Sequence, residues 1–123
     1  MAEHNDFGKE AEEFAVSYLE NKGYTVIARN FYYQKGELDI VALYKDFLVV
    51  VEVKARTRNL FQEPYEAVNK KKIKLVVMAT DAFMNAGNRT EEVRFDIISV
   101  LKTDRGHLDL THIENAFEPF DAN

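Results

Sequence analysis

The chain contains no cysteine, and none of its apolar runs exceeds five residues. The absence of cysteine excludes disulfides, thiolate zinc sites and cysteine nucleophiles, and it suits a reducing cytoplasm. A membrane-spanning helix needs about 20 predominantly apolar residues. Residues 1–6 carry two acids and are not followed by the apolar stretch of a signal peptide. We therefore expect a cytoplasmic protein that does not cross a membrane.

The composition is that of an ordinary folded domain. Of the 123 residues, 46% are hydrophobic and 30% are charged, and a chain of this length can bury a core without help from bridges. No internal repeat, low-complexity stretch or linker interrupts it. We expect a single domain over residues 1–123.

Positive charge is scarce overall but locally concentrated. The net charge is −5, yet residues 54–74 hold seven basic and only two acidic side chains, which leaves −10 on the remainder. A basic segment on an acidic protein fits a phosphate-facing surface. On charge alone, a solvated loop and helix face explains the segment equally well.

Hydrophobic periodicity divides the chain into alternating helical and extended segments. Apolar residues recur at helical spacing over 7–22 and again over 64–86, where Pro64 suits the first helical position. The remaining segments alternate as strands do, over 24–28, 36–44, 47–54, 93–101 and 107–111. The strands on either side of the second helix need a crossover, so we expect an α/β fold with a mixed sheet flanked by helices.

A hairpin places two carboxylates opposite each other. Only Lys45 and Asp46 separate the strands over 36–44 and 47–54, so a two-residue turn brings Asp39 directly across from Glu52, with Cβ atoms about 5 Å apart. Lys54 follows Glu52 by two residues and shares its face. Opposed carboxylates repel each other, and Mg²⁺ would compensate them because it prefers oxygen ligands. From the spacing alone, an exposed pair of acids with a surface salt bridge is an equal alternative.

Two helical residues add to this pattern. Glu12 flanks the apolar stripe of the first helix, from which it can reach the sheet edge, although a solvated glutamate is the commoner outcome. Lys72 falls within the apolar stripe of the second helix, where lysines usually extend to water. An inward Lys72 would instead point toward Asp39 and Glu52.

Other kinds of site find little support. His107 and His112 are five residues apart and lack metal-ligand spacing, so we expect both at the surface. The sequence has no glycine-rich phosphate loop and no nucleophile elbow around its serines.

Several short motifs together resemble one known family. They are Gly-Glu-Leu-Asp-Ile-Val from Gly36, Val-Glu-Val-Lys-Ala-Arg from Val51, Glu-Glu-Phe-Ala from Glu12, Pro-Tyr-Glu-Ala-Val from Pro64, Arg-Phe-Asp from Arg94, and His112-Ile113. In this order they resemble the YraN family, which is similar to archaeal Holliday junction resolvases in the PD-(D/E)xK nuclease superfamily. The resemblance spans nearly the whole chain.

The resemblance implies a restriction-endonuclease-like αβββαβ core with a metal-dependent site. It assigns Asp39, Glu52 and Glu12 as metal ligands, and it makes Lys54 the catalytic lysine, so that these four form the catalytic set. It also supports an active-site-facing Lys72. The sequence departs from the family pattern at Ala11, where a glycine is usual, and at Ile73, where a glutamine is usual. The resemblance implies a polar substrate contact from that glutamine, which Ile73 would not make.

The sequence therefore predicts a Mg²⁺-dependent endonuclease that hydrolyses phosphodiester bonds in DNA, with branched or structured DNA as the candidate substrate. Mn²⁺ is the alternative cofactor, and the backbone carbonyl of Val53 is a further expected ligand. We expect Arg56, Arg58 and Lys72 to contact nucleic acid phosphates, and we leave a homodimer open. The alternative function is a non-catalytic module on the same scaffold that binds nucleic acid or another partner.

Overall fold

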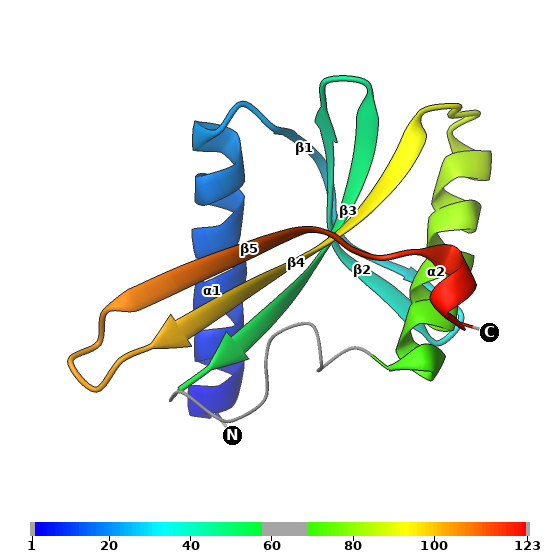
Figure 1. The fold of residues 1–123 in the computed structure, drawn as a ribbon. Coiled ribbons are helices and arrows are strands. Elements are labelled where there is room, and N and C mark those ends of the chain that lie inside the picture. Colours follow the sequence, from blue (N-terminus) through cyan, green and yellow to red (C-terminus); the bar gives the residue numbers. More distant parts are fainter. Residues whose placement is uncertain (1, 58–68, 123) are drawn as a thin grey trace.

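The computed structural model describes residues 2–57 and 69–122, with side chains from Phe7 onward. Over these residues, two α-helices, five strands and a short 3₁₀ helix follow one another (Figure 1). They are α1 (Ala2–Asn21), β1 (Thr25–Tyr33), β2 (Gly36–Tyr44), β3 (Phe47–Arg56), α2 (Lys70–Ala86), β4 (Glu92–Lys102), β5 (Leu108–Phe117) and η2 (Pro119–Ala122). Within these residues no helix has the length and apolar character to cross a membrane.

The strands form one sheet in the order β1-β2-β3-β4-β5. Neighbouring strands are antiparallel except β3 and β4, which are parallel and are connected through α2. The two helices lie on opposite sides of the sheet (Figure 1). The predicted mixed sheet with flanking helices is confirmed, and the arrangement is that of the restriction-endonuclease-like fold.

Each sheet face packs against one helix. Under α1, buried Ala11, Ala15 and Leu19 meet the sheet residues of one cluster. On the other face, Ile73 and Val76 of α2 contribute to a second cluster. Buried residues occur on both faces of the central strands, which accounts for the nearly continuous apolar runs of β2 and β3.

Some predicted boundaries were wrong. The last strand extends to Phe117 rather than ending at 111, and β1 continues to Tyr33 rather than ending at 28. Phe14, one of the apolar residues whose spacing predicted the first helix, is 38% exposed. Pro64, expected to start the second helix, lies outside the described residues. The helix is described from Lys70, with Asn69 as its N-cap.

The predicted register of the hairpin is confirmed, and the pairing of its two strands stops before either strand ends. The paired residues of β2 and β3 run from Tyr44–Phe47 to Ile40–Val51. Beyond this point β2 follows β1 toward α2, whereas β3 continues beside β4 (Figure 1). Gly36 lies so close to α2 that a Cβ atom would come within 2.5 Å of the Leu75 carbonyl oxygen. The sheet therefore opens between β2 and β3 at Asp39 and Glu52, the next pair in the register.

Candidate metal and phosphate site

Asp39 occupies the point where β2 leaves β3. Its Oδ2 atom accepts a hydrogen bond of 2.8 Å from the backbone N–H of Val53. The carboxylate thus satisfies a β3 amide beside the place where the β2–β3 pairing ends. This bond fixes the carboxylate beside Glu52, the residue that precedes Val53 in β3.

Glu52 is a buried carboxylate that faces α2. Its residue is only 2% exposed, and its Oε1 atom lies 3.5 Å from Lys72 Nζ and 4.0 Å from Lys54 Nζ. Asn69 accepts a bond from the Lys72 backbone N–H and begins the helix there, which places Lys72 in the first turn, over the sheet. The structure therefore brings Asp39, Glu52, Lys54 and Lys72 together.

Both carboxyl groups are easier to protonate than usual. Burial, followed by the charge of Glu52, raises the pKa of Asp39 to about 7. Burial also raises the pKa of Glu52, against the opposing charges of Lys72 and Lys54. Two acids share a poorly solvated space and resist carrying two negative charges without a further cation.

This pair of carboxylates includes one oxygen without a hydrogen-bond partner among the described residues. Glu52 Oε2 is buried and accepts no hydrogen bond from the described residues, and an unsatisfied buried carboxylate oxygen is costly. A divalent cation between Asp39 and Glu52 would satisfy that oxygen and offset the repulsion. Because the donors are carboxylate oxygens and Glu52 Oε2 is unsatisfied, the residues present fit Mg²⁺ or Mn²⁺.

Glu12 is held elsewhere. Its two oxygens accept bonds from Arg29 (3.0 Å) and Asn30 (2.9 Å) of β1, and the Asn30 amide also donates to Glu37 (3.2 Å). The Glu12 side chain is 16% exposed, which agrees with its predicted place beside the apolar stripe of the first helix. Within residues 2–57 and 69–122 no three acidic or histidine side chains are grouped closely enough to hold a metal. The structure does not bring Glu12 together with Asp39 and Glu52.

Further basic residues lie on the two elements that carry Lys54 and Lys72. Arg56 follows Lys54 by two residues in β3, so both project from the same face. Lys70, Lys71 and Lys74 are exposed on the first turns of α2. Arg58, expected to contact phosphate, lies outside the described residues. Ile73, the departure from the family pattern, is buried in the core beneath α2.

The sequence-based reasoning missed a buried polar network on the other face of the sheet. Asp96, fully buried in β4, accepts two bonds from Arg94 (3.0 and 2.8 Å) and one from the backbone N–H of Asn115 (3.0 Å). His112 Nε2 lies 2.7 Å from Asp96, and the Tyr18 hydroxyl lies 3.1 Å from His112 Nδ1. The expectation that His112 is at the surface was wrong, since its side chain is 4% exposed.

This network joins α1 to β4 and β5 and is not part of the Asp39 site. Burial by itself would raise the pKa of Asp96, but the hydrogen bonds from His112, Arg94 and Asn115 hold it below its ordinary value. The charge of Asp96 is thus fully compensated, in contrast to the charges of Asp39 and Glu52. The available sequence signal was the alternation of Leu108 and Leu110 with polar residues, because His112 continues it by two positions.

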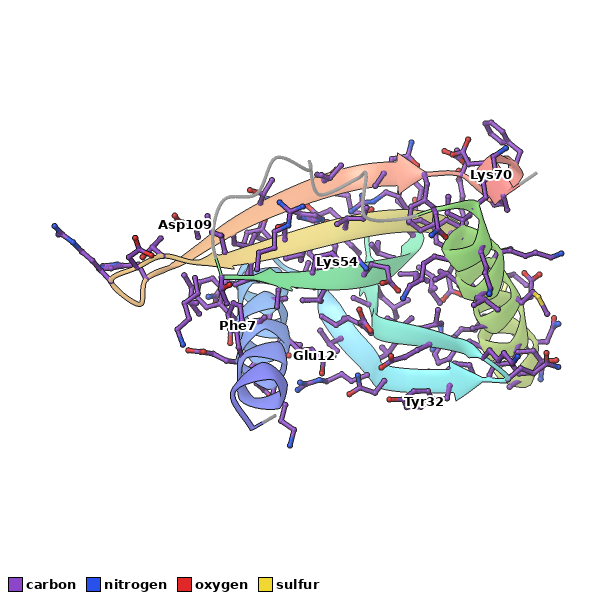
Figure 2. The ribbon with its side chains drawn as sticks, turned by 90° about the horizontal axis from the view of Figure 1, so that it is seen from below. Phe7, Glu12, Tyr32, Lys54, Lys70 and Asp109 are labelled. Atoms are coloured by element: carbon purple, nitrogen blue, oxygen red, sulfur yellow. The ribbon has the colours of Figure 1, made fainter. Side chains whose placement is uncertain are left out.

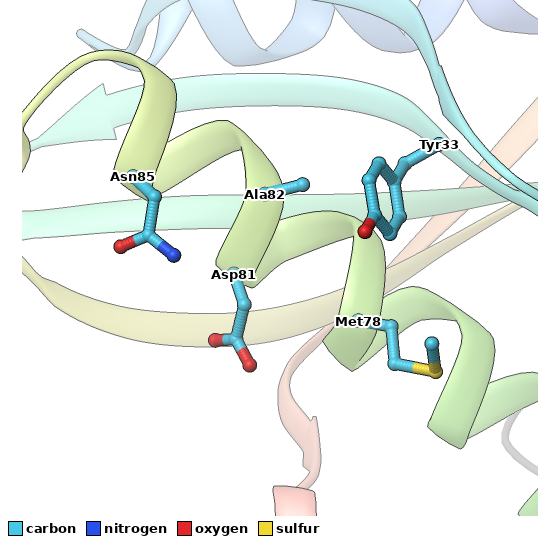
Figure 3. Close-up of a pocket in the computed structure, with 5 residues that line it drawn as sticks. All are labelled: Tyr33, Met78, Asp81, Ala82 and Asn85. Carbon is cyan, nitrogen blue, oxygen red and sulfur yellow. The ribbon is translucent and has the colours of Figure 1, made fainter.

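A shallow pocket lies on the outer surface of α2. It has a volume of about 230 Å³ and is lined by Tyr33, Met78, Asp81, Ala82 and Asn85 (Figure 3). None of these residues belongs to the Asp39 site. The pocket marks the face of the β1–β2 hairpin that packs against α2.

The fold and this site define an α/β protein of the restriction-endonuclease-like class, with paired carboxylates and lysines where its central strands diverge. Residues 11–100 match the model of the uncharacterised protein family UPF0102. The chain is 46% identical to a UPF0102 protein of Phocaeicola vulgatus and 48% identical to one of Bacteroides thetaiotaomicron, in each case over 97% of this chain and 98% of the relative. It is 42% identical to a UPF0102 protein of Flavobacterium psychrophilum over 98% of this chain and the whole of that relative. The chain belongs to the UPF0102 family, which confirms the predicted YraN relationship.

Proposed function

We propose that the protein is a Mg²⁺-dependent endonuclease that hydrolyses phosphodiester bonds in DNA. The observation that carries this proposal is the Asp39–Glu52 pair, in which Glu52 Oε2 is buried without a partner among the described residues although two lysines lie near the other oxygen. Two neighbouring buried carboxylates are unfavourable in the metal-free protein and favourable when they bind a cation. Perturbed carboxyl groups of this kind concentrate at functional sites.

The role proposed for each residue follows from its position in the site. Asp39 and Glu52 would hold Mg²⁺, and Glu12 would act from outside this pair because Arg29 and Asn30 hold it. A bound Mg²⁺ would polarise a phosphate oxygen and offset the charge that develops on it. The Lys54 side chain is 25% exposed, so its ammonium group can turn from Glu52 toward an attacking water or a phosphate.

Lys72 has a different role in this proposal. Its ammonium group compensates Glu52 from the α2 side, at 3.5 Å, and thereby opposes the rise that burial causes in the pKa of Glu52. Arg56, on the face of Lys54, would contact a neighbouring phosphate. Phosphate contacts position a substrate but do not read its sequence.

The test combines metal binding with cleavage. Mg²⁺ and Mn²⁺ titration by calorimetry is expected to show binding that Asp39→Asn and Glu52→Gln abolish. Cleavage is screened on branched, single-stranded and duplex DNA, and Lys54→Met is expected to retain metal binding and lose cleavage. Asp109→Asn, at an exposed position of β5 (Figure 2), is the matched control. Absence of metal binding by the unaltered protein would contradict the proposal.

A second candidate is a non-catalytic nucleic-acid-binding or partner-binding module on the same scaffold. It is favoured by the lack of a three-ligand cluster among the described residues and by the net charge of −5. Nucleic acid binding without metal binding or cleavage would select this module.

A further inference from the structure

Tyr32 is a large aromatic side chain left in solvent beside the candidate site. It is 66% exposed and lies in the edge strand β1, in which no residue is fully buried. Tyr32 lies directly opposite Glu37 in the β1–β2 register, and Asp39, two residues along β2 from Glu37, is near enough for its charge to act on the Tyr32 hydroxyl. Figure 2 labels Tyr32 on β1, Glu12 on α1 and Lys54 on β3.

The neighbours of Tyr32 agree with this placement. The Asn30 amide bridges Glu12 and Glu37, which joins α1 to the hairpin directly next to Tyr32. The charges of Glu37, and to a smaller extent of Asp39 and Glu12, raise the pKa of the Tyr32 hydroxyl. The ring therefore stands at the acidic rim of the site.

The adjacent residue shows that this exposure is specific to one face. Tyr33 points to the other side of the hairpin, where it lines the pocket on α2 with Met78 and Asp81 (Figure 3). Phe31, on the other side of Tyr32, packs edge-to-face on Phe83 of α2 at 5.2 Å between ring centroids. The flanking aromatics are thus accounted for by packing against α2, and Tyr32 is not.

The chemistry of this rim suits a nucleobase better than a phosphate. The carboxylates of Glu12 and Glu37 repel phosphate, whereas they can accept hydrogen bonds from the amino groups of bases. An exposed aromatic ring offers a stacking surface to any base, and such stacking is worth about 1–3 kcal/mol per base. A base paired within a duplex is not free to stack on it.

We propose that Tyr32 stacks on an unpaired nucleobase of the substrate next to the phosphate bound at Asp39, Glu52 and Lys54. This inference rests on the proposed function, and it specifies the substrate class: nucleic acid with unpaired nucleotides at or beside the bond that is cut. Tyr32 is in this view a specificity residue. A fully paired duplex binds more weakly than nucleic acid with unpaired nucleotides.

The experiment measures stacking separately from catalysis. A 2-aminopurine is placed in a single-stranded oligonucleotide, in a bulged duplex and in a fully paired duplex, and binding is followed by its fluorescence in EDTA. We expect quenching with the first two and not with the third. Tyr32→Ala should weaken binding of the unpaired substrates about 5- to 160-fold, the range that corresponds to loss of one stacked base, and Tyr32→Phe should bind as the unaltered protein does.

Tyr33→Ala is the matched control and is expected to leave binding and quenching unchanged. Mg²⁺ affinity, measured by calorimetry, should be the same in Tyr32→Ala and the unaltered protein. Equal losses for paired and unpaired substrates, or no loss in Tyr32→Ala, would overturn the stacking role and leave the nuclease proposal intact. Ring-dependent quenching without any Mg²⁺ binding would overturn the nuclease proposal and leave stacking intact, while absence of all nucleic acid binding would overturn both.

Discussion

Replacement of Asp39 by asparagine should make the metal-free protein more stable at alkaline pH. The pKa of Asp39 is about 7 in the folded protein and has an ordinary value of 3.8. Between these values the folded state binds more protons than the unfolded state, so the free energy of unfolding falls as pH rises, and it levels off above about pH 7. The substituted asparagine carries no charge and retains a side-chain oxygen that can accept the Val53 N–H.

The size of the effect follows from the pKa. Each pH unit within this window costs about 1.4 kcal/mol, so raising the pH from 5 to 8 should cost the unaltered protein about 2–3 kcal/mol more than Asp39→Asn. Urea unfolding followed by circular dichroism at both pH values, in EDTA, measures the difference. Asp109→Asn, at an exposed position, should remain within about 0.5 kcal/mol of the unaltered protein at both.

The same unfolding measurement with added Mg²⁺ completes the experiment. Mg²⁺ at 100 times its dissociation constant should stabilise the unaltered protein by about 2.7 kcal/mol and leave Asp39→Asn unaffected. The reasoning about charge repulsion would be refuted if Asp39→Asn were destabilised by the same amount at pH 5 and pH 8. That result would identify Asp39 as a structural acceptor for Val53.

Three further outcomes are expected. Arg56→Ala should lower the slope of log affinity against log salt for duplex DNA by about one unit, whereas Arg105→Ala, in the β4–β5 turn, should not; equal slopes in a salt titration would argue against a phosphate contact at Arg56. Asp96→Ala should destabilise the protein by about 3–5 kcal/mol in urea unfolding, because it removes the fully buried carboxylate that pairs with Arg94 and accepts the Asn115 N–H; a loss below about 1 kcal/mol would contradict that role. Gly36→Ala should cost about 1–3 kcal/mol, because its Cβ meets the helix α2 backbone. Gly8→Ala, with open space around it, is the control and should be neutral or stabilising in thermal unfolding.

Short-range periodicity was enough to predict the centre of the candidate site. The two-residue turn at Lys45 and Asp46 sets the register of the β2–β3 hairpin, and the period of two places Lys54 with Glu52. The helical period placed Lys72 within the apolar stripe of α2, from which it reaches Glu52. These relations involve residues close in sequence or joined by one tight turn, so local geometry determines them.

Only the tertiary structure decided the remaining features. The departure of β2 from β3, which turns Asp39 onto the Val53 amide, depends on how closely Gly36 packs on α2. The bond between Tyr18 and His112 joins residues 94 positions apart, and no local pattern reports such a contact. Whether a polar side chain on a strand is buried or exposed depends on the element that covers it, and that element is placed by the packing of the whole chain.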